Sequence, residues 1–275
     1  MAVVSVRFPS RHTSPPRRRA GPQGTALPHA RRTRHLLRVC LALAAALTLA
    51  HLFLRAPLTT VLTEALPAAW VKAAATNAQN ALDLAQLRPS QAPAARLEAL
   101  TTRFAAMAAP DSGALPYRLA FRKGGANGPL SYALPDGSIV VSDELLAALP
   151  DDTHVLAVLC HELGHLQGRH MLRASIEDQV FSLALASVLG LRHTVIHALT
   201  RGILNVETRD THHFEADRFA QRMLAQNGLP PLTLQTALAS LARQSSTTPA
   251  PSPLLRSPSA GLIQSRLRSL PPARG

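Results

Sequence analysis

The stretch from His161 to His165, with the sequence HELGH, constrains this chain more than any other. It forms the HExxH pattern, and on a helix the two histidines, four positions apart, project from one face. Glu162 follows His161 at about 100° around the helix. Two neutral imidazoles leave room on Zn²⁺ for a third protein ligand and a water molecule, and a nearby carboxylate can take a proton from that water. The pattern therefore predicts one bound zinc ion, with His161 and His165 as ligands and Glu162 as the catalytic base.

The residues before the motif favour this interpretation over a chance match. HExxH is short and also arises on solvated helices that bind nothing. Here the four apolar residues Val155, Leu156, Val158 and Leu159 precede it, which indicates a buried helix. Asp151 and Asp152 come just before that run and are suited to cap the start of the helix.

The charge of the chain is concentrated at one end. Its formal net charge is +13, but residues 1–55 hold ten arginines and no acidic residue, which leaves 19 basic and 16 acidic residues for the rest. The body is nearly neutral and lacks the basic, aromatic-rich face of a nucleic-acid-binding domain, so no specific nucleic-acid partner is expected. Cys40 and Cys160 lie far apart, and no disulfide framework or cysteine zinc cluster follows from them.

The N-terminal part resembles a tail followed by a membrane anchor. Residues 1–35 are rich in arginine and proline and lack apolar periodicity, which predicts a disordered basic tail. Residues 39–54 are an apolar run of 16 residues, about 24 Å long as a helix against roughly 30 Å of hydrocarbon. We therefore predict a single-pass signal anchor at 36–56, with the N-terminus in the cytoplasm of a bacterial cell and the remainder beyond the inner membrane. The alternative is secretion to the periplasm after cleavage of this segment.

The body alternates helical and strand patterns, which predicts a mainly helical α+β fold with a small sheet. A free edge of such a sheet could bind an extended peptide by strand addition, although a plain stabilising hairpin explains the same pattern. The predicted helices are 58–87 with a break at Pro67, 93–109, 181–191, 193–206 and 211–227, and the predicted strands are 117–122, 130–134 and 138–142.

One histidine near the motif is not expected to bind zinc. The sequence from His165 to His170 resembles the extended HExxHxxGxxH motif, but its last histidine comes one residue early and Met171 stands at the ligand position. We therefore look for the third ligand elsewhere.

The predicted helix 211–227 offers the better candidates. His213 and Asp217 share one stripe of this helix with apolar residues, whereas Glu215 lies on a charged stripe. The buried stripe should face the zinc, which favours His213 as the third ligand and Asp217 as an acceptor that orients a ligand. Glu215 remains the alternative third ligand, because carboxylates also bind Zn²⁺.

These motifs together resemble the gluzincin peptidase family that contains the HtpX-type and CAAX prenyl proteases. The similarity covers about residues 80–270 and includes the ALPDG turn at 133–137, the DELL segment at 143–146 and the FEADR segment at 214–218. It implies His161 and His165 as zinc ligands and Glu162 as the base. The chain departs from the family pattern where the usual ligand glutamate aligns with His213, where a common asparagine aligns with Leu130, and where a Thr-His-Pro segment aligns with 256–258.

These observations predict a membrane-anchored zinc endopeptidase with a zincin-like domain, acting on unfolded or damaged envelope proteins. The alternative is a zinc-binding scaffold or holdase without peptidase turnover. Tyr132, His197 and Arg266 are candidate donors to the oxyanion of the reaction. The predicted organisation is a disordered tail (1–35), a transmembrane helix (36–56), a helical N-terminal part of the catalytic region (57–110), the metallopeptidase core (111–244) and a linker with a short C-terminal helix (245–275).

Overall fold

The computed structural model describes residues 28–85, 87–110, 115–177, 179–205 and 210–244. The chain divides into one unit of residues 1–50 and another of residues 51–275. The predicted linker and C-terminal helix at 245–275, and with them Arg266, lie outside the described residues.

The first helix corrects the predicted boundary of the tail. Helix α1 spans Pro28–Ala65 and so begins inside the segment 1–35 for which we predicted no regular structure. Arginine, alanine and leucine, which dominate its first half, are good helix formers, and proline is tolerated in the first turn because its missing N–H has no partner there. Among the described residues, no helix is both long and apolar enough to cross a membrane, so the transmembrane helix predicted at 36–56 receives no support from the structure.

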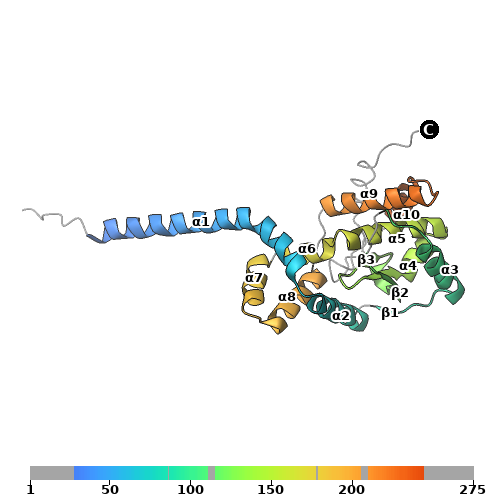
Figure 1. The fold of residues 1–275 in the computed structure, drawn as a ribbon, viewed down its shortest axis with the longest axis horizontal. Helices are drawn as coiled ribbons and strands as arrows, with labels where there is room; N and C mark the ends of the chain where they lie inside the picture. The colour runs from blue at the N-terminus through green and yellow to red at the C-terminus, as the bar shows by residue number, and fades with distance from the viewer. Residues whose placement is uncertain (1–27, 86, 111–114, 178, 206–209, 245–275) are drawn as a thin grey trace, which may run out of the picture. The chain divides into compact units, whose positions relative to one another are not determined.

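The second unit contains the predicted helices and strands in the predicted order (Figure 1). The chain breaks between α1 and α2 at Pro67, as expected. The mainly helical α+β class with a small sheet is confirmed. The elements after α1 are α2 (Ala68–Ala85), β1 (Arg88–Pro89), α3 (Ala94–Ala105), β2 (Arg118–Lys123), the 3₁₀ turn η1 (Gly125–Asn127), β3 (Ser131–Ala133), β4 (Ser138–Ser142), α4 (Asp143–Ala148), α5 (Asp152–Gln167), α6 (His170–Glu177), α7 (Val180–Val188), α8 (Arg192–Asn205), α9 (Asp210–Gln226) and α10 (Thr233–Gln244).

The four strands form one sheet in the order β1-β2-β4-β3, so that β3 lies at an edge. β2 and β4 are parallel, and the other two pairs are antiparallel. Leu134 N donates to Ser138 O and Ser142 N donates to Leu130 O, on either side of the Tyr132–Val140 pair. Because hydrogen-bonded and non-hydrogen-bonded pairs alternate in an antiparallel ladder, the backbone N–H and C=O of Ser131 and Ala133 point away from β4, at the outer edge of the sheet.

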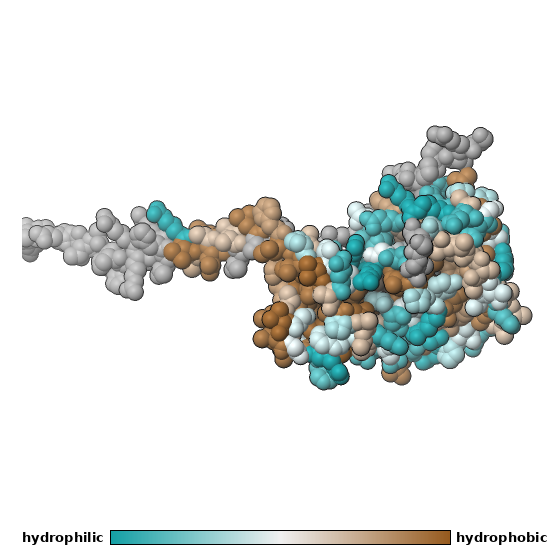
Figure 2. Space-filling view, in the orientation of Figure 1, coloured by the Kyte–Doolittle hydropathy of each residue, from teal (hydrophilic) through white to brown (hydrophobic). Residues whose placement is uncertain are grey.

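Helix α5 lies at the centre of one of the two hydrophobic cores that the described residues form. It packs against α9 and α10 and against β3 and β4 (Figure 1). Leu100 and Phe104 of α3 complete this core from a third direction. The other core joins α2 to α6, α7 and α8. Figure 2 shows apolar side chains gathered on the surface over α7, where Leu185, Val188 and Leu189 are exposed.

Candidate metal centre

Helix α5 presents the HExxH motif from a buried position. The Asp151 carboxylate accepts a hydrogen bond from Thr153 N at 2.8 Å and caps the start of the helix, as predicted. All residues from 155 to 166 are buried, because the helix is enclosed by the sheet on one side and by α9 and α10 on another. The motif is therefore held by packing on several sides.

Three histidines converge at the contact between α5 and α9. Nε2 of His165 lies 3.0 Å from Nε2 of His161 and 3.1 Å from Nδ1 of His213. Their three ligand atoms all lie within 4.8 Å of one another. Nitrogen ligands at about 2.0–2.1 Å from a tetrahedral zinc are roughly 3.3 Å apart, so the two spacings from His165 are close to those of a zinc site. The structure thus brings together the three residues predicted as ligands.

The close approach of the two helices depends on Gly164. A Cβ atom added there would lie 2.9 Å from both Cα and O of Ala216, nearer than an ordinary van der Waals contact. The absence of a side chain at Gly164 lets the backbones of α5 and α9 touch. Because Ala216 lies within one helical turn of both His213 and Asp217, this contact sets the distance of both side chains from the motif.

Asp217 contacts one of the histidines, His161, as the predicted orienting role requires. Its carboxylate is buried, and Oδ1 lies 2.7 Å from Nδ1 of His161. An ionised carboxylate only accepts hydrogen bonds, so Nδ1 of His161 donates and Nε2 keeps its lone pair. That lone pair is directed at the convergence of the three histidines, as zinc binding requires.

Glu215, the alternative third ligand, points elsewhere. Its Oε2 lies 3.0 Å from Nε2 of His170, and its side chain is 62% exposed. The other ring nitrogen of His170, Nδ1, lies 3.1 Å from Nδ1 of His165. Burial is the main cause that lowers the pKa of His170 to about 4, and the neighbouring His212 is the second. The imidazole of His170 is therefore neutral at pH 7. The geometry therefore favours His213 over Glu215 as the third ligand.

The predicted base is held by a residue that sequence reasoning missed. Glu162 is buried, and its Oε1 accepts a hydrogen bond from Ser131 Oγ at 2.6 Å. Ser131 lies on the edge strand β3, and the alternation of side chains along a strand places it on the face opposite to Tyr132. That alternation was readable in the sequence, but nothing there indicated which face turns towards α5.

The two candidate oxyanion donors among the described residues, Tyr132 and His197, have surroundings away from the three histidines. The Tyr132 hydroxyl lies 3.4 Å from Oε1 of Gln79 in α2, and burial raises its pKa. His197 is exposed on α8, a helix that packs on α2, α6 and α7. For both residues, the structure therefore offers no support for the predicted role.

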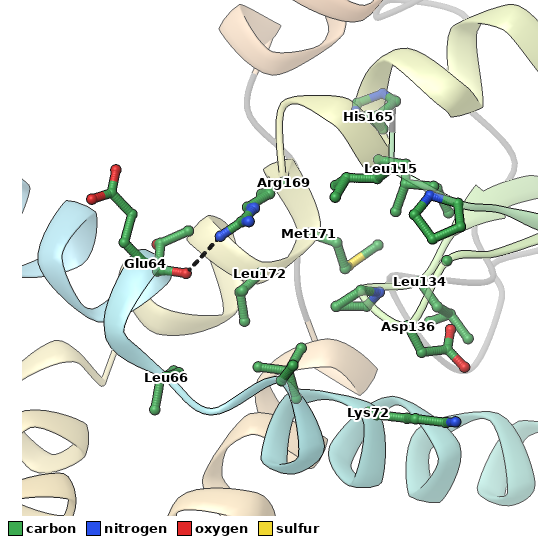
Figure 3. A pocket seen from close by; sticks show the side chains of 18 residues that line it. Glu64, Leu66, Lys72, Leu115, Leu134, Asp136, His165, Arg169, Met171 and Leu172 are labelled. Carbon is green, nitrogen blue, oxygen red and sulfur yellow. Dashed lines mark hydrogen bonds between the residues drawn. The ribbon is translucent and has the colours of Figure 1, made fainter. Parts of the chain in front are cut away.

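A cleft of about 480 Å³ opens beside His165 (Figure 3). Its walls come from the end of α1, the start of α2, the turn between β3 and β4, and the bend between α5 and α6. Arg169 lines one side and donates a hydrogen bond to Thr63 O at 3.1 Å. Most of the remaining wall is apolar, and it includes Leu66, Val71, Leu115, Leu134, Met171 and Leu172.

Comparison with known proteins agrees with this geometry. The model of Peptidase family M48, which includes the HtpX-type members, matches residues 91–265, more than half of the chain. The matched residues include the three candidate ligands His161, His165 and His213 as well as Glu162 and Asp217. The comparison with curated proteins returns no match. The chain therefore belongs to Peptidase family M48, a family of zinc-dependent metallopeptidases.

Proposed function

We propose that this metallopeptidase is an endopeptidase that cleaves internal peptide bonds of unfolded or damaged proteins. The observation that carries the proposal is the convergence of His161, His165 and His213 beside the carboxylate of Glu162. This arrangement supplies the ligands for one zinc ion and a group that can move a proton next to it.

Each side chain has a defined task in the proposed reaction. The three histidines hold the zinc, and Asp217 keeps His161 in the tautomer that can bind it. When bound, zinc polarises the scissile carbonyl and makes water acidic enough to lose a proton near neutral pH. Glu162 takes that proton on its carboxylate and delivers it to the leaving amine. Ser131 donates to Oε1 of Glu162, which fixes the orientation of the carboxylate.

Two features near the centre suit an extended polypeptide. The edge strand β3 directs the N–H and C=O groups of Ser131 and Ala133 outwards, where a peptide can add as a further strand. The cleft beside His165 begins next to Ala133 and has room for apolar side chains of that peptide. An unfolded chain offers extended segments along its whole length, whereas a folded protein offers few. The proposed substrates are therefore unfolded chains.

A single substitution tests the proposed reaction. Glu162→Gln keeps the size of the side chain but removes its ability to accept a proton. We expect the parent to cleave casein, and the variant to lose activity by a factor of at least about 100 while it still binds one zinc per chain by metal analysis. Glu98→Gln, which changes an exposed glutamate on α3, serves as the matched control and should cleave at the parental rate. A Glu162→Gln variant as active as the parent contradicts the proposal.

A chelator separates this function from the alternative of a holdase. A peptidase loses cleavage of casein when zinc is removed and regains it when zinc is returned. A holdase instead suppresses the aggregation of unfolded protein without producing fragments. If the zinc-loaded parent suppresses aggregation and yields no fragments, the holdase replaces our proposal.

The location is a separate proposal, supported by the uncharged run at 39–54 and by the exposed apolar side chains of Leu37, Val39 and Leu41 on α1. We place the chain in the bacterial inner membrane with residues 57–275 on the periplasmic side. Carbonate washing of membranes should leave the full chain in the pellet. Recovery in the soluble periplasmic fraction of a chain that begins after residue 50 would instead support cleavage and secretion.

A further inference from the structure

His170, which does not converge with the three ligand histidines, joins the metal centre to an exposed carboxylate. His170 is 1% exposed and lies between two partners, with Nδ1 3.1 Å from Nδ1 of His165 and Nε2 3.0 Å from Oε2 of Glu215. Its ring also stacks on His212, with the centroids 4.7 Å apart and the planes 8° from parallel. His165, His170 and Glu215 form a continuous row that ends at the surface, since the Glu215 side chain is 62% exposed.

The chemistry of these groups fixes where the protons lie along the row. The carboxylate of Glu215 can only accept, so Nε2 of His170 donates to it. A neutral imidazole carries one N–H, which leaves Nδ1 of His170 as an acceptor. Nδ1 of His165 therefore donates to His170, and Nε2 of His165 is left with its lone pair directed at His161.

Two unprotonated nitrogens then face each other at the centre. Asp217 holds the single proton of His161 on Nδ1, and His170 does the same for His165. Nε2 of each ring is therefore unprotonated. These two atoms lie 3.0 Å apart and have no proton to share, which is unfavourable unless a cation lies between them.

We propose that His170 and Glu215 form a positioning relay that holds His165 in its zinc-binding tautomer and raises the affinity of the site for zinc. The proposal rests on the zinc site of the proposed function. It assigns Glu215 a task other than binding zinc. It also gives each of the two motif histidines a carboxylate that sets its tautomer, Asp217 directly for His161 and Glu215 through His170 for His165.

The local backbone is shaped to place His170 there. Helix α5 ends at Gln167 with Gly168 as its C-cap, and Arg169 has a φ of 51°, a left-handed conformation that a residue with a side chain rarely adopts. A Cβ atom at Gly168 would overlap the ring of His170, so the ring packs where only glycine leaves room. The hydrogen bond from Arg169 Nη1 to Thr63 O links this bend to the end of α1. These features turn the chain so that residue 170 contacts the outer side of His165.

The proposal predicts a graded loss of zinc affinity in three variants of the full chain. His170→Leu removes both hydrogen bonds and should weaken zinc binding by about 10- to 100-fold. His170→Asn places an amide oxygen near the position of Nδ1, where it can accept from His165, and should recover most of this loss. Glu215→Gln keeps the shape of an exposed side chain but removes its charge, and should give a smaller loss in the same direction. Glu98→Gln is the control for removal of a surface carboxylate.

Zinc affinity is measured by competition with a chromophoric chelator, and the geometry of the site by the visible absorption of the cobalt-substituted chain. His170→Leu should shift the cobalt bands, and His170→Asn should restore them, which a general loss of packing would not do. Equal zinc affinity in the parent, His170→Leu and Glu215→Gln overturns the relay and leaves the proposed function intact. A parent that binds no zinc overturns both. Because Glu215 is exposed, its variant tests the relay even if His170→Leu does not fold.

Discussion

The contact of Gly164 with α9 leads to a quantitative prediction. Replacing Gly164 by alanine places a Cβ 2.9 Å from Cα and O of Ala216 and 3.1 Å from Cβ of Phe219, whereas ordinary contacts begin near 3.4 Å. Two of these three atoms belong to the backbone of α9 and one to a side-chain root, so none can turn aside. We expect α5 and α9 to separate by about half an ångström in the Gly164→Ala variant.

Two opposing effects set the change in stability. Overpacking of this kind destabilises a core by about 1–3 kcal/mol, whereas alanine is favoured over glycine inside a helix by about 1 kcal/mol. The steric effect is the larger, and we expect a net loss of about 1 kcal/mol, or a fall in Tm of about 2–4 °C. The metal centre should be more sensitive. His213 and Asp217 both move with α9, and such sites tolerate displacements of only about 0.5 Å, so zinc affinity should fall at least about tenfold.

Gly202 provides a matched control. A Cβ there would lie 2.8 Å from Ser175 O, an equally close backbone contact, but between α8 and α6. Ser175 lies more than a helical turn after His170 in α6, so Gly202→Ala should lose stability but lose less zinc affinity than Gly164→Ala. Thermal unfolding and zinc competition are measured on both variants. If Gly164→Ala binds zinc as tightly as the parent, or if Gly202→Ala loses as much affinity, the α5–α9 contact does not set the ligand geometry.

Three further predictions follow from other contacts. Ser131→Ala removes the hydrogen bond to Glu162 and should lower kcat by about 10- to 100-fold, the equivalent of about 1.5–3 kcal/mol, with zinc affinity unchanged; an unchanged kcat refutes this task. Arg96 donates to Asp152 Oδ1 and to two carbonyl oxygens at the end of α4. Arg96→Lys should therefore lower the free energy of unfolding by about 1–3 kcal/mol in urea titration. An unchanged free energy of unfolding would contradict the role of the planar guanidinium. Burial raises the pKa of the Cys160 thiol to about 12, so iodoacetamide at pH 8 should modify Cys160 only after unfolding, and mass spectrometry of peptides that finds rapid modification of the folded chain would contradict this.

Helical periodicity was sufficient to predict how α9 faces the centre. Residues 213 and 217 lie about 40° apart around a helix, whereas residue 215 lies about 200° from residue 213. Asp217 is 1% exposed and reaches His161, and Glu215 lies mostly in solvent. The choice between His213 and Glu215 thus followed from one rule, that the apolar stripe of a helix faces the core.

The start of α1 shows where composition misleads. Residues 28–35 carry three arginines and no acidic residue, a composition that we read as disordered, yet they are helical. Arginine is rarely buried, but it forms helices well, with a helix propensity close to that of leucine. Low hydrophobicity therefore gave no information about the backbone of these residues.

His170 shows the limit of reasoning from spacing. We rejected it as a ligand because it falls one residue short of the HExxHxxGxxH position, and it does lie outside the group of ligand nitrogens. Spacing alone gave no further role, because the periodicity of α5 ends at Gln167 and the next residues do not continue the helix. The left-handed conformation of Arg169 bends the chain between α5 and α6, and arginine at that position gives no sign of it in the sequence. As a result His170 reaches Nδ1 of His165 and not Nε2, so that a histidine one residue too early for the metal contacts the ligand from its other side.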